Sequence, residues 1–552
     1  MVLRVAQIEP SEPPVTACPA SGFAYDRRQP ELQALHKAVR IGWPQLQERI
    51  AHHTAAALPK FVVKSFEAYL TCGQLAAGFC RVLCKGCREE QFVAWSCKKR
   101  GLCASCDGKR MLEESEHLLN SVLPAVPYRQ WCLSLPFDLR YLLAWNAEMR
   151  SAVLQALLRA ITRYYTVQAA LAGIEGPVHT GAITVIQRFS SDLRLNLHYH
   201  VLFGDGVWTE DNGEAIFHPA PPLDDQAVQE VLLDAQLRID RQLKKRGWQD
   251  RSDNPFADRE PALSALMQAS IRGQLFDSPE VPPRNSGTNA QERALPKRAS
   301  RNCAAAGGYS LHADRRIAPK DREELAFMVR YLCRPAVAAE RLTELGDGQF
   351  ALKLKTAFKD GTATVQISAL DLVSRLSAQV PLPRSCSLRY SGVFAPNANL
   401  RPLVVLAGDQ APTRRKKVAA AVSADASNKS ADVDAEELER KTSTRLTWAQ
   451  ALRAAFKIDV LTCQKCGGTK QVIAAIPAGA IATKILRHLG LPTQVVTKAA
   501  PCDVWRVRGP PGELDDFGDD EPQVHPDAID EEYEEIGMRP FFDDEEGQLK
   551  AA

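Results

Sequence analysis

The sequence has 552 residues, of which 45% are hydrophobic and 24% charged, which excludes a disordered or fibrous protein and predicts three or more domains. It has no run of about 18 apolar residues and no N-terminal apolar core typical of a secretion signal, so we expect a cytoplasmic protein without a membrane partner. The net charge of +3 conceals an asymmetry: residues 513–552 carry 16 acidic and two basic residues (net −14), and the +17 left on residues 1–512 favours a polyanionic partner.

The chain begins with a Pro-rich segment, residues 1–30, that we predict to be flexible, followed by a helical and zinc-binding domain over 31–120. Apolar residues recur at helical spacing from 31 to 69. Seven of the 15 cysteines then lie between Cys72 and Cys106. In a chain without a secretion signal, such clustering is typical of metal binding in a reducing compartment rather than of disulfides.

Two Cys-x-x-Cys pairs with 15 residues between them stand in this cluster, Cys84/Cys87 and Cys103/Cys106. Tetrahedral zinc takes four thiolates, so the spacing predicts one structural zinc site made by the two pairs. Cys97 is a fifth thiol that is able to replace one of the four, whereas Cys72 and Cys80 are expected to be packing residues. Because all-cysteine ligation leaves no open position, this zinc would fold the domain rather than catalyse a reaction.

The main domain is predicted over 125–405, with the polar residues 250–310 as an insertion or flexible loop. Its expected helices and strands alternate along the chain: strand Gln130–Pro136, helix 143–172, strands Gly181–Phe189 and Leu195–Phe203, helix Asp321–Arg334, and paired strands within 353–370 around Asp360-Gly361. In the helix Asp321–Arg334, Asp321 is placed to cap the N-terminus and Pro335 to end it.

Two histidines, His198 and His200, lie in the predicted strand Leu195–Phe203. Alternate side chains of a strand share a face, so both imidazoles point the same way while the apolar residues between them point to the other side. Two histidines are too few for a closed zinc site, but they suit a divalent ion that keeps positions open for water and phosphate. Two solvated or hydrogen-bonded histidines on an exposed face fit the segment equally well.

Tyr331 lies in the helix Asp321–Arg334, about 110° around the helix axis from the centre of its apolar stripe. It therefore flanks the face that we expect to be buried. This position fits a cleft or interface, and it also fits a partly buried packing residue.

The C-terminal part is predicted to consist of a linker over 406–443, a small domain over 444–500 and an acidic, disordered tail over 501–552. The small domain contains one Cys-x-x-Cys pair, Cys463/Cys466. A single pair fits either half of a metal site or a structural turn. As half of a site, it would be completed by Cys502, by a histidine such as His488, or by another chain.

Several separated segments, in this order, resemble the rolling-circle insertion-sequence transposases of the His-hydrophobic-His nuclease superfamily, and among them the single-tyrosine branch. The segments are Gly78–Cys84, Ser96–Cys106, Gln130–Pro136, Thr184–Phe189, Leu195–Leu202, Arg330–Pro335, Arg389–Asn397 and Cys466–Gly468. The first two are similar to the N-terminal zinc-binding domain of that family. The resemblance implies an α+β fold with an antiparallel-sheet nuclease core, an N-terminal four-cysteine zinc-binding domain and a small C-terminal domain.

The resemblance also implies a reaction. Tyr331 would attack a DNA phosphodiester and form a 5′-phosphotyrosine, while His198 and His200 would bind Mg²⁺ or Mn²⁺, with Gln187 on the neighbouring strand as a third ligand. Two-tyrosine relatives carry another tyrosine one helical turn earlier, where this chain has Phe327, so one nucleophile is expected on this helix.

The implied partner is DNA, mainly the single-stranded ends of the mobile element, and the implied location is the bacterial nucleoid. Candidates for DNA contact are Arg188, Arg194, Arg330 and Arg334 near the site, and Lys297, Arg298, Arg301, Arg315 and Arg316 in the insertion. For each of them alone a solvated surface charge is the favoured alternative, and only the +17 of residues 1–512 as a whole favours nucleic acid. Two other functions fit the same features: a replication initiator or relaxase with the same nicking chemistry, and a zinc-dependent DNA-binding protein without catalysis.

Overall fold

The computed structural model describes residues 29–248, 255–274, 301–355, 357, 361–405, 462–463 and 465–496. The predicted linker and acidic tail lie outside these residues, as does all but the end of the predicted flexible N-terminus. Among the helices that are described, none is both long and apolar enough to cross a bilayer.

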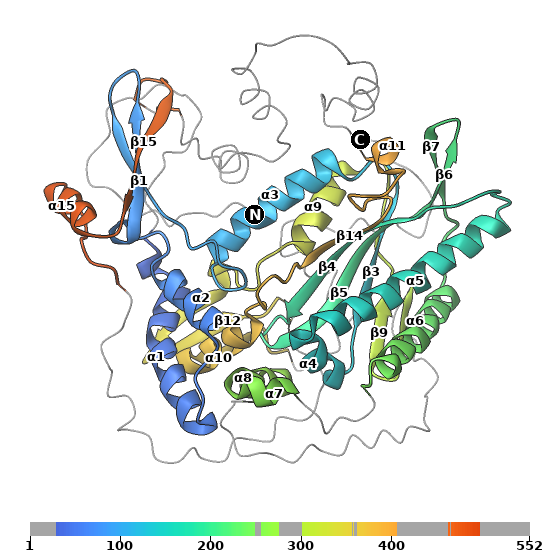
Figure 1. The fold of residues 1–552 in the computed structure, drawn as a ribbon, viewed down its shortest axis with the longest axis horizontal. Helices are drawn as coiled ribbons and strands as arrows, with labels where there is room; N and C mark the ends of the chain where they lie inside the picture. Colours follow the sequence, from blue (N-terminus) through green and yellow to red (C-terminus); the bar gives the residue numbers. More distant parts are fainter. Residues whose placement is uncertain are drawn as a thin grey trace, which may run out of the picture.

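A sheet of seven strands forms the centre of the molecule (Figure 1). Its order is β14-β4-β5-β3-β9-β8, with β10 paired to β3, and all these pairings are antiparallel. The strands are β3 (Tyr128–Ser134), β4 (Gly181–Phe189), β5 (Leu195–Gly204), β8 (Cys303–Ala306), β9 (Tyr309–His312), β10 (Arg316–Ile317) and β14 (Leu388–Gly392). The strands predicted at 181–189 and 195–203 are thus confirmed, as are the α+β class and the antiparallel core.

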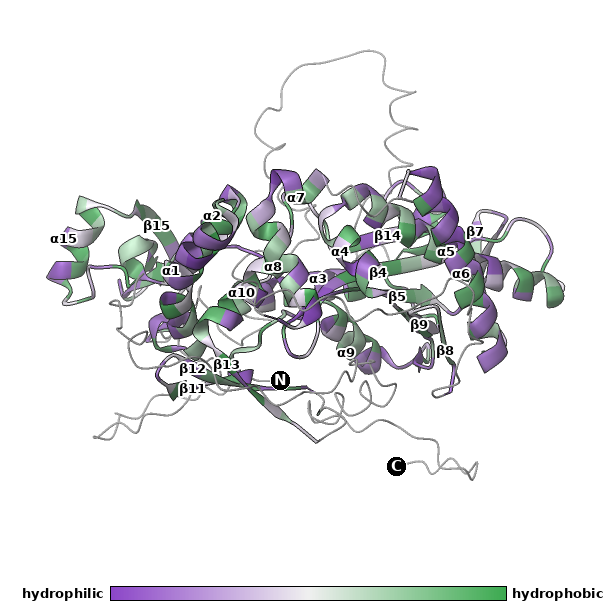
Figure 2. Cartoon of the chain, turned by 90° about the horizontal axis from the view of Figure 1, so that it is seen from below, coloured by the Kyte–Doolittle hydropathy of each residue, from purple (hydrophilic) through white to green (hydrophobic). Residues whose placement is uncertain are grey.

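Helices cover both faces of this sheet. One face packs against α4 (Phe137–Trp145), α5 (Ala147–Leu171) and α6 (Asp225–Lys245), and the other against α3 (Ala104–Ser121) and α9 (Arg322–Leu332). Figure 2 shows α5 and α9 on opposite sides of the sheet. The alternation of β5 decides which residues face which layer: Tyr199 and Val201 enter the core under α5 and α6, so His198 and His200 face the layer that contains α9.

The N-terminal helices α1 (Ala34–Thr54) and α2 (Lys60–Leu70) belong to a second core. They share it with α8 (Pro261–Arg272), α10 (Ala369–Gln379) and a small sheet of β11 (Leu342–Gly346), β12 (Gln349–Lys353) and β13 (Thr364–Ser368). The predicted helical N-terminal region is therefore confirmed. Of the strand pair predicted within 353–370, β13 lies in this range, whereas its partner β12 ends at Lys353, so the pair begins earlier than predicted.

The prediction that residues 250–310 form an insertion or flexible loop is wrong for the part that is described. Within it lie α7 (Pro255–Arg259), α8, β8 and the start of β9. In α8 the buried residues Leu263, Leu266, Met267 and Ser270 follow the i, i+3, i+4, i+7 spacing of a core-facing helix. The polar residues on either side of this short apolar stretch dominate the composition and conceal the spacing.

A third sheet, of three strands in the order β15-β1-β2, combines the two ends of the described chain. β1 (Gly78–Cys84) pairs with β2 (Glu90–Ala94) on one side and with β15 (Lys470–Pro477) on the other. Figure 1 shows β1 and β15 side by side, with α15 (Ala480–His488) next to them. The described residues of the predicted C-terminal domain thus share a sheet with the N-terminal domain.

The predicted helix that carries Tyr331 is confirmed as α9. The Asp321 carboxylate caps it by accepting a hydrogen bond from the Glu324 amide at 3.0 Å. At the same end, the Arg322 guanidinium donates to the carbonyl oxygens of Leu119, at 2.5 Å, and Leu123, at 3.0 Å. The helix is therefore fixed against the C-terminal end of α3.

Candidate active site and cysteine clusters

His198 and His200 lie together on the inner face of β5, with ring centroids 4.8 Å apart. Both are buried, at 7% and 3% exposed. β5 is a central strand, hydrogen-bonded to β3 and β4 along its length, so its backbone positions the two imidazoles rigidly. The structure brings together the pair that the sequence predicted.

Hydrogen bonds to the Nδ1 atoms orient both rings. His198 Nδ1 lies 3.0 Å from the Asn196 carbonyl oxygen, and His200 Nδ1 lies 2.9 Å from the side-chain amide of Gln130. In the structure the atom of Gln130 that faces His200 Nδ1 is Nε2; with this amide turned by 180°, Gln130 Oε1 would accept from His200 Nδ1–H, and the Nε2 lone pair of each ring would be available to a metal ion. Burial lowers the pKa of His200 well below its usual value, and the positive charges of nearby groups act in the same direction. His200 is therefore neutral, which is the form that binds metals.

Gln187 lies directly across from His198 in the β4–β5 pairing, and it is 3% exposed. Its amide nitrogen donates to the Leu332 carbonyl oxygen at 2.9 Å. Among the described residues, neither Gln187 Oε1 nor His200 Nε2 has a hydrogen-bond partner. A buried polar atom without a partner costs about 1–3 kcal/mol, so these atoms fit a site for a divalent ion with nitrogen and oxygen ligands.

Tyr331 lies against this group of residues. It comes from the last turn of α9, it is 7% exposed, and its ring centroid is 6.1 Å from that of His200. The hydrogen bond from Gln187 to Leu332, the neighbour of Tyr331, fixes this end of the helix to β4. The prediction that Tyr331 only flanks the buried face of α9 is wrong, because Tyr331 is a buried member of the core between α9 and the sheet.

Two cations flank the tyrosine ring. The Arg334 guanidinium lies 4.0 Å from the ring centroid, and the Lys355 ammonium lies 5.7 Å from it. Arg334 was predicted near the site from the sequence, whereas Lys355 and Gln130 were missed. Gln130 had a detectable signal, since it is a polar residue within an otherwise apolar strand. Lys355 had none, because only the tertiary fold brings it to α9.

Of the other basic residues predicted near the DNA, Arg188 is used within the fold, whereas Arg316 remains partly exposed. The Arg188 guanidinium is buried and donates to the carbonyl oxygens of Ala144, at 2.8 Å, and Gln379, at 3.2 Å. Arg316 is paired with the buried carboxylate of Asp205 at 2.7 Å. Arg188 thus stabilises contacts within the fold, whereas the Arg316 side chain is 44% exposed, so its contact with DNA stays a prediction. Lys297 and Arg298 lie outside the described residues.

The predicted zinc site made by the two N-terminal Cys-x-x-Cys pairs is also wrong as a set. The structure divides its four thiols between two clusters, one containing Cys72, Cys97, Cys103 and Cys106 and the other containing Cys84, Cys87, Cys463 and Cys466. The two pairs are separated because Cys84 and Cys87 lie at the turn between β1 and β2, whereas β2 leads back to Cys97 at the other end of the hairpin.

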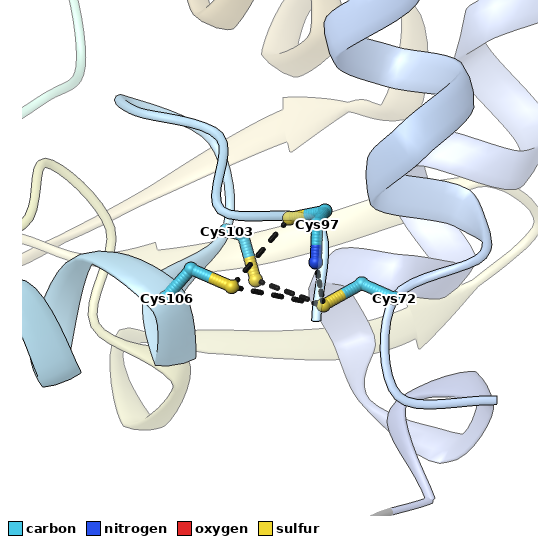
Figure 3. A group of neighbouring side chains, drawn as sticks. All are labelled: Cys72, Cys97, Cys103 and Cys106. Atoms are coloured by element: carbon cyan, nitrogen blue, oxygen red, sulfur yellow. Dashed lines mark hydrogen bonds between the residues drawn. The ribbon is translucent and has the colours of Figure 1, made fainter. Parts of the chain in front are cut away.

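The first cluster has the dimensions of a tetrahedral zinc site (Figure 3). Its sulfur atoms are 3.7 Å apart for Cys72 and Cys103, 3.8 Å for Cys72 and Cys106, and 3.6 Å for Cys97 and Cys106. Four thiolates at about 2.3 Å from a central zinc lie about 3.8 Å from one another. Cys97, the predicted alternative ligand, belongs to this cluster, and Cys72, which was expected to be a packing residue, belongs to it as well.

Two family models match the chain. The model of a transposase zinc-binding domain matches residues 42–135, and that of a putative transposase matches residues 181–401. The chain belongs to the insertion-sequence transposases. No curated protein and no solved structure matches it. As a transposase, the protein acts on DNA.

The matched ranges assign the two candidate sites of this transposase to different domains. His198, His200 and Tyr331 all lie within the range of the putative transposase model. The complete first cysteine cluster lies within the range of the zinc-binding domain, which supports zinc as the ion for this cluster. Of the second cluster, only Cys84 and Cys87 lie within a matched range.

Proposed function

We propose that this transposase nicks and rejoins single-stranded DNA through a covalent 5′-phosphotyrosine at Tyr331. The observation that carries the proposal is the position of the Tyr331 ring, 6.1 Å from that of His200, at a group of buried polar atoms without partners among the described residues. A replication initiator or relaxase would use the same chemistry, but the family models favour transposition.

His198 and His200, through Nε2, and Gln187, through Oε1, would hold Mg²⁺ or Mn²⁺, which would polarise the scissile phosphate. The Tyr331 phenol loses its proton and its oxygen attacks the phosphorus. A bond forms between this oxygen and the phosphorus, the bond from phosphorus to the 3′ oxygen breaks, and that oxygen takes up a proton to become a free 3′-OH.

The cations beside Tyr331 would assist both reacting groups, the tyrosine and the phosphate. Arg334 and Lys355 lie within 4.0 Å and 5.7 Å of the ring centroid, where positive charge stabilises a phenolate and attracts a phosphate. The phosphotyrosine retains the energy of the broken phosphodiester. A 3′-OH is therefore able to attack it later and rejoin strands without ATP.

One tyrosine on α9 implies one covalent strand at a time. The residue one turn before Tyr331 is Phe327, which is buried and has no hydroxyl. We therefore expect a single DNA adduct per chain. We propose that the enzyme acts in the cytoplasm, on DNA of the nucleoid, with a preference for single strands.

The test is the formation of a covalent adduct with a labelled single-stranded oligonucleotide from the element end, in the presence of Mn²⁺, followed on a denaturing gel. Wild type is expected to form the adduct and Tyr331→Phe to form none. The matched control is Tyr309→Phe, because Tyr309 is also buried but packs in the core on the opposite face of the sheet. It should form as much adduct as wild type.

Equal adduct in wild type and Tyr331→Phe would refute the assignment of the nucleophile. A wild type that binds DNA but forms no adduct would identify a DNA-binding protein without catalysis. Faster cleavage of replication-origin DNA than of element ends would favour an initiator. Equal binding of an unlabelled duplex competitor would refute the preference for single strands.

A further inference from the structure

The second cysteine cluster joins segments from the two ends of the described chain. Its ligand atoms lie within 4.8 Å of one another, although Cys84 and Cys466 are 382 positions apart. We propose that Cys84, Cys87, Cys463 and Cys466 bind a second structural zinc ion, which fastens residues 462–496 to the N-terminal domain. No residue of the predicted tail, no histidine and no second chain is needed to complete it.

The distances fit a tetrahedral ion. The sulfurs of Cys84 and Cys466 lie 3.5 Å apart, and those of Cys87 and Cys463 lie 3.4 Å apart. Both values are far longer than the roughly 2.0 Å of a disulfide and near the roughly 3.8 Å expected around a zinc ion. Each short distance joins one pair to the other, so the thiols form one group rather than two.

The two Cys-x-x-Cys turns have the same backbone conformation. The Cys84 amide donates to the carbonyl oxygen five residues later at 2.9 Å, and the Cys463 amide does the same at 2.8 Å. The carbonyl oxygen of each cysteine also accepts from the amide four residues later, that of Arg88 at 3.2 Å and that of Gly467 at 2.7 Å. Those two residues have matching positive φ angles of 65° and 71°. Two turns that are unrelated in sequence position thus present their thiols alike.

Positive φ at Arg88 is an independent sign of a constrained turn. A residue with a Cβ atom adopts this conformation at a cost of about 1 kcal/mol or more. The cost is offset when the turn is held by an interaction with its side chains. A metal ion bound by Cys84 and Cys87 supplies such an interaction.

Small residues surround the sulfurs. A Cβ atom added at Gly86 would lie 3.2 Å from the Cys466 sulfur, and one added at Gly468 would lie 3.2 Å from the same sulfur and 3.3 Å from that of Cys84. Side chains at these positions would crowd the thiols. The glycines therefore leave room for the four sulfurs to close around an ion.

The local hydrophobic core is too small to fasten the segment without help. Its buried members are Leu75, Phe79, Ile476, Ala482 and Leu486. Such a small core stabilises a fold only marginally, and metal sites are a common supplement in small units. A structural zinc adds folding free energy directly, because the unfolded chain has no preformed site. β15 then extends the sheet beside β1 from Cys84↔Lys470 to Gly78↔Pro477.

The test counts zinc in the purified full-length protein by elemental analysis. Wild type is expected to contain two zinc ions per chain, and Cys463→Ser/Cys466→Ser one. Cys103→Ser/Cys106→Ser, which removes thiols of the first cluster, is also expected to retain one. The matched control is Cys386→Ser, because Cys386 is exposed and belongs to neither cluster; it should retain two.

One zinc ion per wild-type chain would overturn the proposal, as would two ions in Cys463→Ser/Cys466→Ser. Alkylation of the wild type gives a second measurement, which does not depend on the folding of any variant. Cys386 should react at once, whereas Cys463 and Cys466 should react only after a chelator is added. Labelling of Cys463 in the zinc-loaded protein at the rate of Cys386 would also overturn the proposal.

Discussion

Replacement of Asp205 by asparagine gives the sharpest test of how the strands of the site are held together. Asp205 directly follows β5 and is 2% exposed. Its carboxylate accepts from Arg129 Nε on β3 at 3.0 Å, from Arg316 Nε on β10 at 2.7 Å, and from the Tyr165 hydroxyl on α5 at 2.8 Å. Asp205→Asn preserves the volume of the side chain but removes its charge. It also replaces one acceptor oxygen by an amide NH₂ group, which would face the N–H and O–H groups that now donate to the carboxylate.

The expected loss is about 3–5 kcal/mol of the free energy of unfolding, the typical cost of removing one partner from a buried ion pair. Most of it arises from Arg129, which is 4% exposed and remains charged because a guanidinium does not deprotonate in proteins. The Arg316 side chain is 44% exposed, so water screens its part of the interaction to about 1 kcal/mol or less.

Urea unfolding, followed by tryptophan fluorescence at constant zinc, measures this loss. With a slope of about 1–3 kcal/mol per molar urea, the midpoint should fall by more than about 1 M. The matched control is Asp234→Asn, because Asp234 pairs with Arg238 at 2.9 Å near the surface, where the loss should stay below about 1 kcal/mol. Equal midpoints for the two variants would refute the reasoning, since they would show that the buried charge of Arg129 needs no partner.

Two further predictions concern a proposed ion ligand and a buried histidine. Gln187→Glu keeps a ligand oxygen, whereas Gln187→Leu removes it. In titrations with Mn²⁺, the leucine variant should therefore bind this ion more than about tenfold more weakly than the glutamate variant. Equal affinities for Mn²⁺ would show that Gln187 only tethers α9. Burial lowers the pKa of His36. Below about pH 6.5, the unfolded chain therefore takes up a proton at this histidine that the folded chain does not. The free energy of unfolding should then fall by up to about 1.4 kcal/mol for each pH unit as the pH falls. His36→Phe should reduce this slope in urea unfolding measured from pH 7 to 5, and an unchanged slope would contradict the prediction.

The predictions that succeeded rest on short-range patterns. The alternation that places His198 and His200 on one face and Tyr199 on the other is a property of a single strand, and β5 has it in the structure, although both faces are buried. The cap at Asp321 and the apolar stripe of α9 are likewise contained within one helix. Such patterns determine the direction of side chains, but they do not determine which neighbour covers them.

The grouping of the cysteines failed for the opposite reason. Every Cys-x-x-Cys pair has the same spacing in the sequence, so spacing alone favours the two pairs that are nearest to each other along the chain. The actual grouping depends on the pairing of β1 with β15 and on two cysteines, Cys72 and Cys97, that belong to no such pair. Neither can be read from a local pattern, because both follow from contacts between segments that are distant in the sequence.

Long-range contacts also connect the first cysteine cluster to Tyr331, the proposed nucleophile. Cys103 and Cys106 lie at the N-terminal end of α3, so an ion bound there fixes where this helix begins. The C-terminal end of α3 accepts hydrogen bonds from Arg322 in the first turn of α9, and the last turn of α9 carries Tyr331. The position of Tyr331 is therefore set from both ends of α9, by Gln187 of the sheet and by a helix that starts in the zinc-binding domain. A zinc ion at this cluster would have no open position for substrate, and it would support the proposed reaction by fixing the helix that carries Tyr331.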